Sequence, residues 1–207
     1  MTSAANASLI VNMVPVAMPF LLYFVVSEKI TRAEGLGTLV AMSGVFLMGA
    51  SDFNLSMDYL VGDLICFISM LFYAFYLVFG RKYNDLPSIY VYIVPVYMVS
   101  GILCLGLTLG IQMSGHPVVW IGPGLQTELI SILGLAIVPT VFGHTLINAA
   151  FRQIRGQVVS IFNLTQFMFA GILAYLFLDE IPVILFYVAS LLVVIGAYIT
   201  LKGRKST

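Results

Sequence analysis

His144 is the only ionisable side chain in the apolar segment between Glu128 and Arg152. Asn148 follows four residues after His144 and Arg152 four residues after that, so the three lie on one face if the segment is helical. An imidazole with an ordinary pKa of about 6.5 can form hydrogen bonds and can also exchange a proton near neutral pH. This face therefore suits contact with a polar solute, with or without proton exchange, or hydrogen bonding to a neighbouring helix.

Two more apolar segments carry amide side chains, and the first of them also contains two prolines. Asn12, Pro15 and Pro19 lie on roughly one face of the first segment, whereas Asn163 and Gln166 are three residues apart in a later one. Each proline lacks a backbone N–H and frees the carbonyl four residues earlier, and such breaks persist in lipid where they line a cavity or find new partners. The amide side chains of Asn12, Asn163 and Gln166 suit either solute contact or hydrogen bonds between helices.

A third candidate surface is a stripe of hydroxyl groups. Ser69, Tyr73 and Tyr76 follow one another at helical spacing. The tyrosines could hold an aromatic or amphipathic solute, although aromatic stripes also serve in packing between helices.

The composition places these segments in a membrane. Of the 207 residues, 61% are hydrophobic and 9% are charged, and the mean hydropathy is +1.07. A soluble domain has about 25% charged residues, so this chain has too little polar surface to cover a globule in water. The net charge is zero, which indicates no nucleic-acid partner. Cys66 and Cys104 lie in apolar runs and suit neither a metal site nor a disulfide.

The hydropathy pattern predicts an all-α polytopic membrane protein with seven transmembrane helices. A bilayer core of about 30 Å needs about 20 residues of apolar helix. The predicted spans are 7–27, 35–53, 60–79, 88–113, 128–151, 157–178 and 182–201, with the longest loop at 114–127.

The basic residues give the predicted spans an orientation. All nine follow odd-numbered spans: Lys29, Arg32, Arg81, Lys82, Arg152, Arg155, Lys202, Arg204 and Lys205. Because Lys and Arg collect in cytoplasmic loops, we expect an outside N-terminus and a cytoplasmic C-terminus.

An internal repeat relates the two ends of the chain. Residues 8–49 and 160–202 each contain two apolar helices joined at an acidic residue, and Glu28 and Gly44 match Glu180 and Gly196 at a constant offset of 152 residues. The predicted orientation puts Glu28 on the cytoplasmic side and Glu180 on the outer side, so the copies are inverted. Inverted repeats with a substrate site between them are typical of secondary transporters. Glycine pairs, Gly37 with Gly44 and Gly106 with Gly110, favour close approach of helices.

These residues resemble a known family. Pro15, thirteen residues before Glu28, followed by Gly37 and Gly44, resembles the closing helix pair of an EamA-type repeat in the drug/metabolite transporter superfamily. The stretch 139–150, PTVFGHTLINAA, is similar to the third helix of that family's second repeat. Leu178-Asp179-Glu180 followed by Gly196 resembles the end of the same repeat, so the resemblance covers nearly the whole chain.

The resemblance implies two inverted five-helix repeats, of which this chain holds a part. Residues 1–53 would be the last two helices of the first repeat, and residues 54–207 the complete second repeat. Three absent helices would account for the outside N-terminus, so we expect a chain that is N-terminally truncated relative to the ten-helix pattern. Phe167 stands where the second repeat usually has the proline found here at Pro15, so a paired helix break is less strongly indicated.

The function implied by the resemblance is transport of a small organic metabolite by alternating access. The scarcity of cations within the spans disfavours a strongly anionic substrate, so we expect a neutral or zwitterionic, amino-acid-like or drug-like solute. The candidate residues of the substrate pathway are Asn12, Pro15, Pro19, Ser69, Tyr73, Tyr76, His144, Asn148, Asn163 and Gln166. We expect no catalytic residues, no metal and no cofactor, and hence no enzyme.

Two alternatives stay open. A truncated carrier would be inactive alone and would need a partner chain, either a second copy in a homodimer or the missing N-terminal fragment. A seven-helix receptor-like protein would leave the repeat unexplained, and a retinal protein would need a lysine in the middle of the last span, where none occurs. The expected partners are the lipid bilayer and a small-molecule substrate, and the expected location is a bacterial inner (plasma) membrane.

Overall fold

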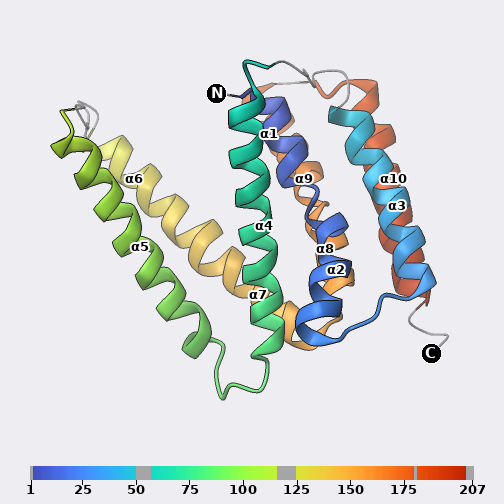
Figure 1. Cartoon of the computed structure of the whole chain (residues 1–207). Helices are drawn as coiled ribbons and strands as arrows, with labels where there is room; N and C mark the ends of the chain where they lie inside the picture. The colour runs from blue at the N-terminus through green and yellow to red at the C-terminus, as the bar shows by residue number, and fades with distance from the viewer. Residues whose placement is uncertain (1, 50–56, 116–124, 180, 204–207) are drawn as a thin grey trace. The chain divides into compact units, whose positions relative to one another are not determined.

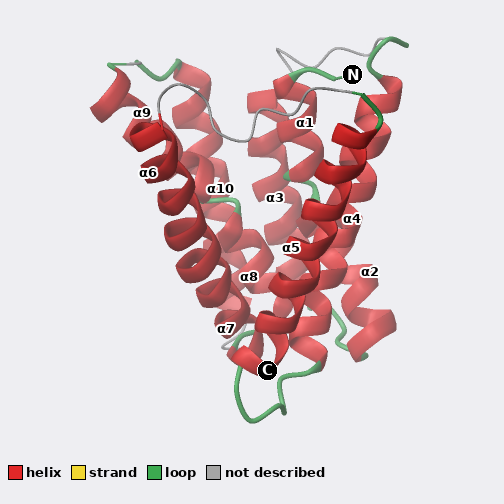
Figure 2. Ribbon diagram, turned by 90° about the vertical axis from the view of Figure 1, so that its left-hand side faces the viewer, coloured by secondary structure: helices red, strands yellow, loops and turns green. Residues whose placement is uncertain are grey.

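The computed structural model describes residues 2–49, 57–115, 125–179 and 181–203, and all regular structure in these ranges is helical (Figures 1 and 2). The helices of the first part of the chain are α1 (Ala4–Val11), α2 (Val14–Val26), α3 (Arg32–Gly49), α4 (Leu60–Lys82) and α5 (Tyr90–Met113). They are followed by α6 (Leu125–Leu135), the π-helix η1 (Ala136–His144), α7 (Thr145–Gln153), α8 (Gly156–Asn163), α9 (Gln166–Leu178) and α10 (Ile184–Lys202).

The predicted membrane-spanning character is confirmed. Six segments of the described residues are long and apolar enough to cross a membrane: Asn6–Val26, Leu60–Lys82, Tyr90–Met113, Glu128–Gln153, Gly156–Phe177 and Ile184–Lys202. The remaining predicted span corresponds to α3, which begins with the charged residues Arg32 and Glu34. Its predicted end at 50–53 lies outside the described residues, as do most of the loop 114–127, Glu180 and the basic residues Arg204 and Lys205.

The chain divides into two compact units, each described by itself below. One comprises Met1–Lys82 and Ile154–Thr207, and it contains both copies of the internal repeat. The other comprises Tyr83–Gln153, with α5, α6, η1 and α7.

Helices α3 and α10 form the tightest pair of the first unit and lie side by side in Figure 1. A Cβ atom at Gly37 would lie 2.5 Å from the carbonyl oxygen of Gly196, and a Cβ at Gly44 would lie 2.7 Å from that of Ala189. From the first contact to the second, the residue number rises along α3 and falls along α10, so the two helices are antiparallel. Because Gly44 and Gly196 are related by the repeat, and so are Gly37 and Ala189, each copy presents the same surface to the other. Small residues allow this backbone contact, which is how helices pack tightly in lipid.

The glycine pair on α5 meets no other helix of its own unit. No atom of the other helices of that unit comes within 4 Å of a Cβ built at Gly106 or at Gly110, whereas Gly37 and Gly44 both meet α10 of their own unit. A small-xxx-small pattern supplies a flat surface, but only a facing helix makes use of it, and the pattern does not specify that helix.

Apolar side chains from both copies fill the core of the first unit. Leu9, Val45, Ile161, Leu164 and Val193 are buried together, with Phe167 packed at the edge of the cluster. Helices α1, α3, α8 and α10 therefore share one core, which holds the two broken helices α1–α2 and α8–α9 in position.

Candidate functional site

The first broken helix changes direction at Asn12 and Met13, directly before Pro15. Helix α1 ends at Val11, and the backbone N–H groups of Met13 and Val16 donate to the carbonyls three residues earlier, at Ile10 and Met13. The side chain of Asn12 donates from Nδ2 to the Ser8 carbonyl at 2.9 Å. One tight turn, stabilised by its own asparagine, thus replaces the regular helical bonding.

The second copy has the same break at matching positions, 152 residues later. The N–H groups of Thr165 and Met168 donate to the carbonyls of Phe162 and Thr165, each at 3.0 Å. The two long helices also end alike, because Ser27 and Asp179 both adopt left-handed backbone angles, with φ of 58° and 54°. The two copies therefore share both bonds of the tight turn and the left-handed helix end.

The expectation drawn from Phe167 needs correction, because the helix break is paired although only the first copy has the proline. In the second copy the hydroxyl of Thr165 donates to the Phe162 carbonyl at 2.7 Å, which is the type of local bond that bends helices. A proline favours such a turn but is not required for it.

The two breaks contact one another. Gln166 Nε2, in the first turn of α9, donates to Asn12 Oδ1 at 3.3 Å. Asn163 is the last residue of α8 and is half-buried. The structure thus brings together Asn12 and Gln166, two of the predicted pathway residues, from opposite ends of the chain.

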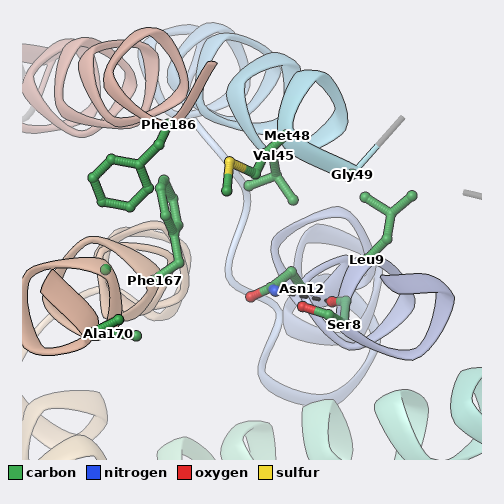
Figure 3. Close-up of a pocket in the computed structure, with 11 residues that line it drawn as sticks. Ser8, Leu9, Asn12, Val45, Met48, Gly49, Phe167, Ala170 and Phe186 are labelled. Carbon is green, nitrogen blue, oxygen red and sulfur yellow. Dashed lines mark hydrogen bonds between the residues drawn. The ribbon is translucent and has the colours of Figure 1, made fainter. Parts of the chain in front are cut away.

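A cavity of about 390 Å³ adjoins these breaks (Figure 3). Ser8 of α1 and Asn12, which follows α1, lie on one side, and Phe167 of α9 and Phe186 of α10 lie on another. The two phenyl rings meet edge to face, with centroids 5.9 Å apart. The remaining lining residues are apolar or small: Leu9, Val45, Met48, Gly49, Ala170, Gly171 and Ala174.

At the other end of the same helices, charged side chains join the first copy to α4 and to the start of α8. We call Glu28, Glu34, Arg81 and Arg155 the charged cluster. Arg155 Nε lies 2.5 Å from Glu34 Oε1, and Arg81 Nε lies 3.2 Å from Glu28 Oε2. Glu28 also accepts the backbone N–H of Gly156 at 3.2 Å. The hydrogen bond with Glu34 raises the pKa of Arg155 above its ordinary value, so the guanidinium group keeps its positive charge.

Local hydrogen bonds within its own helix start hold Glu34 in place, independently of Arg155. Its carboxylate accepts the N–H of Thr31 at 2.7 Å, and the Thr31 hydroxyl accepts the N–H of Glu34 at 3.2 Å. This reciprocal arrangement is a capping box at the start of α3, and the spacing Thr31-x-x-Glu34 is its sequence signature. Our sequence analysis missed Glu34 and Arg155, although that signature could have drawn attention to Glu34.

Gln157 is a further residue that the sequence did not single out. It lies in the first turn of α8, is fully buried, and donates from Nε2 to the Pro15 carbonyl at 3.0 Å and to Thr38 Oγ1 at 2.7 Å. Pro15 is therefore buried and bonded through its carbonyl, and Pro19 lies half-buried inside α2. No local sequence pattern predicts that a glutamine in the first turn of an apolar segment will bond to Pro15 and Thr38.

The predicted stripe on α4 is only partly enclosed. Tyr73 and Tyr76 are half-buried and stack on each other with centroids 6.3 Å apart, whereas Ser69 is exposed. None of the three lines the cavity of Figure 3.

His144 and Asn148 belong to the second unit. His144 ends the π-helix η1, and Asn148 is buried, with Nδ2 donating to the His144 carbonyl at 2.8 Å. The π-helix contains Pro139, which has no N–H to donate, and the Thr140 hydroxyl donates to the Leu135 carbonyl at 3.0 Å. π-helical turns within helices are frequent at functional sites.

Arg152, the last member of the predicted His144 face, contacts backbone. Its Nη2 donates to the carbonyls of Asn84 and Leu86, and so it holds the connection that precedes α5. Among the described residues, no three His, Cys, Asp or Glu side chains cluster closely enough to hold a metal ion.

Six apolar spans and a repeat with paired helix breaks define a class: an integral, multi-pass membrane protein of the transporter type. The chain belongs to the EamA-like transporter family, whose model matches residues 60–202. It is thus a membrane transporter of small molecules, as the sequence resemblance implied.

Comparison with solved structures supports the fold. One crystal structure, described only as that of a protein, is similar to this chain with a TM-score of 0.78 and 18% identity. The similarity covers 96% of this chain and 69% of the other chain. Among curated proteins, none matches the sequence.

Proposed function

We propose that this chain carries a small neutral or zwitterionic organic solute by alternating access, along a pathway between the two repeat copies. The observation that carries the proposal is the pair of matching helix breaks joined by the Asn12–Gln166 hydrogen bond. Broken helices in a membrane expose backbone and amide groups that can bind a solute, and inverted repeats provide the movement that exposes the site to each side in turn.

The cavity beside the breaks supports the solute class. Its volume of about 390 Å³ is within the usual range for small-molecule sites, about 300–1,000 Å³. None of the eleven described residues that line it is ionisable, whereas Ser8 and Asn12 offer polar groups and Phe167 and Phe186 offer aromatic surface. Such a lining suits a solute with an apolar part and one or two hydrogen-bonding groups. A solute with a full net charge would lack a counter-charge here.

The charged cluster supports alternation. It closes one end of the helices whose other end borders the cavity, so we infer that this end must open during transport. The distribution of Lys and Arg places the cluster on the cytoplasmic side in our proposal and the N-terminus outside, in a bacterial inner (plasma) membrane. We further propose that Ser69, Tyr73, Tyr76, His144, Asn148 and Asn163 contact the solute in other steps, with His144 available for proton exchange.

The domain assignment is part of the same proposal. Residues 1–53 are the closing helix pair of the first EamA-type repeat and residues 54–207 the second repeat. The family match at 60–202 lies within the second repeat. The alternative function is a carrier that needs a second copy or a separate N-terminal fragment to complete its pathway.

The proposal can be tested with the purified chain in phosphatidylethanolamine/phosphatidylglycerol vesicles. Uptake of tritiated leucine and phenylalanine, two zwitterions, is compared with uptake of labelled citrate, an anion. We expect uptake of at least one zwitterion, a decrease of about tenfold in Asn12→Ala and in Gln166→Ala, and no citrate uptake. Ser43→Ala is the control, because the exposed Ser43 hydroxyl bonds to the Val40 carbonyl of its own helix.

The possible results separate the alternatives. Unchanged uptake in both amide variants would contradict a pathway at the breaks, and citrate uptake would contradict the solute class. Uptake that appears only when vesicles contain cross-linked dimers, or an added N-terminal helical fragment, would favour the incomplete carrier.

A further inference from the structure

Gln157 is a fully buried amide that links three helices of the first unit. It projects from α8 of the second copy, and its Nε2 donates both to the Pro15 carbonyl of α2 and to the Thr38 hydroxyl of α3. These residues are 142 and 119 positions away in the sequence. Gln157 therefore joins the two repeat copies at the core of the unit.

The contact with Pro15 has a specific cause. In a regular helix the Pro15 carbonyl would accept the N–H of residue 19, but residue 19 is a proline and has none. A buried carbonyl without a donor is costly in an apolar environment. Gln157 Nε2, at 3.0 Å, supplies the missing donor from the other copy.

The contact with Thr38 fixes the orientation of the amide. The Thr38 hydroxyl donates to the Glu34 carbonyl at 2.7 Å, so it can only accept from Gln157. Because the Pro15 carbonyl also accepts, both contacts require the NH₂ group of the amide, and the flipped amide would place an acceptor against both.

The second copy has no counterpart of this arrangement. The position that matches Pro19 is Gly171, which keeps its N–H, and the position that matches Gln157 is Ala5. The need for a donor from outside the helix arises from the proline, and the donor is present only where the proline is.

We propose that Gln157 is a positioning residue for transport: it replaces the hydrogen bond that Pro19 removes, and it thereby couples movement of the broken helix α2 to movement of α8. The coupling to transport rests on the proposed function, whereas the replacement of the hydrogen bond does not. A helix weakened by Pro19 can bend, and the Gln157 contact makes that bend depend on the position of the second copy.

The first test is a double-mutant cycle measured by thermal unfolding of the purified chain in detergent. Gln157→Met keeps the side-chain volume and removes the donors, and we expect it to lower Tm by about 5 °C. Pro19→Ala restores a backbone N–H for the Pro15 carbonyl. In the Pro19→Ala chain, the Gln157→Met substitution should therefore lower Tm by less than half as much.

The control for the cycle is Thr200→Val on α10. Thr200 is also buried, but its hydroxyl bonds to the Gly196 carbonyl of its own helix, so its Tm decrease should be the same in the wild-type chain and in the Pro19→Ala chain. Equal decreases for Gln157→Met in both backgrounds would overturn the proposal. If Gln157→Met alone does not fold, folding of the double variant supports the proposal, and failure of both overturns it.

The second test separates positioning from simple stabilisation. Uptake of the tritiated zwitterion is measured at a temperature where Gln157→Met and Thr200→Val are both folded. We expect uptake to fall about tenfold in Gln157→Met and to stay near the wild-type level in Thr200→Val. Equal uptake in the two variants would show that Gln157 acts only on stability and would overturn the coupling. If the wild-type chain takes up no solute, the proposed function fails, while the cycle still decides whether Gln157 replaces the lost bond.

Discussion

The two repeat copies share a backbone but differ in the side chains at their ends. Both have a tight turn at the same position and a left-handed residue at the same helix end. Yet Glu34 of the first copy corresponds to Phe186 of the second, and Pro19 corresponds to Gly171. Glu34 forms an ion pair with Arg155, whereas the Phe186 ring lies where a Cβ of Gly171 would be, at 2.3 Å.

Because of this difference, the two ends of the helices are chemically unlike although the backbone of the two copies is similar. One end is joined by ion pairs in which the carboxylates are largely buried and the guanidinium groups partly exposed, and the other is bordered by aromatic rings around a cavity. Opening the charged end requires ions to separate and be solvated again, whereas closing the cavity requires only that rings and helices shift.

Arg155→Ala should have the largest effect on stability. It leaves Glu34, whose side chain is 3% exposed, without its ionic partner, and we expect a loss of about 3 kcal/mol in the free energy of unfolding. This is the low end of the range for buried pairs, because Arg155 itself is 32% exposed. Chemical denaturation in detergent measures the loss. Arg32→Ala, at an exposed arginine of the same end, should change stability by less than about 0.5 kcal/mol; equal losses would contradict the role of the cluster.

Gly196→Ala tests the symmetric contact between α3 and α10. The new Cβ would lie 2.5 Å from the Gly37 carbonyl oxygen and 2.7 Å from the Ala41 nitrogen, so the helices must separate. We expect a loss of about 2 kcal/mol, measured by the same denaturation. Gly106→Ala is the matched control because no atom of another helix of its unit lies within 4 Å of its Cβ position. A neutral result at Gly196 would mean that the helices approach less closely than the contact implies.

Gly171→Ala should affect uptake more than stability. The added Cβ displaces the flexible Phe186 ring, which can turn into the cavity, so we expect a stability loss of about 1 kcal/mol and a clear decrease in uptake of the zwitterion. Gly171→Ala/Phe186→Leu should recover uptake, because the smaller side chain leaves room. If uptake is unchanged in Gly171→Ala, the solute does not need this cavity.

The smallest expected effect is the difference in the free energy of unfolding between Phe167→Pro and Phe167→Ala. Phe167 is the second residue of α9, where the N–H has no helical acceptor, so a proline is tolerated as it is at Pro15. We expect the two variants to differ by less than about 0.5 kcal/mol. Leu173→Pro, in the middle of α9, should cost about 3 kcal/mol or more. A large difference at residue 167 would mean that the second break is a regular helix in solution.

The sequence predicted the features that depend on local chemistry. Hydropathy located the spans, and the 152-residue offset located both copies, because lipid burial and helix packing impose patterns along the chain. It did not predict the break at Thr165, since the turn there depends on a hydroxyl that is common in helices. It also missed Gln157 and the Arg155–Glu34 pair, because their partners are more than 100 residues away and no local pattern specifies them.

The prediction of His144 and Asn148 as pathway residues rests only on their residue types and on their depth in the predicted membrane span. The structure adds that Asn148 bonds to the His144 carbonyl and that the π-helix ends at His144. Neither contact involves the first unit, so the link between these residues and the breaks at Asn12 and Gln166 remains a prediction.

The most direct test of the account is a reversible lock on the charged end. In a Cys66→Ala/Cys104→Ala background, Glu34→Cys and Arg155→Cys are introduced together and oxidised to a disulfide, and uptake of the tritiated zwitterion is measured in vesicles. We expect uptake to stop in the oxidised chain and to return after reduction, because the proposed alternating access requires this end to open in every cycle. Equal uptake in the oxidised and reduced chains would contradict it.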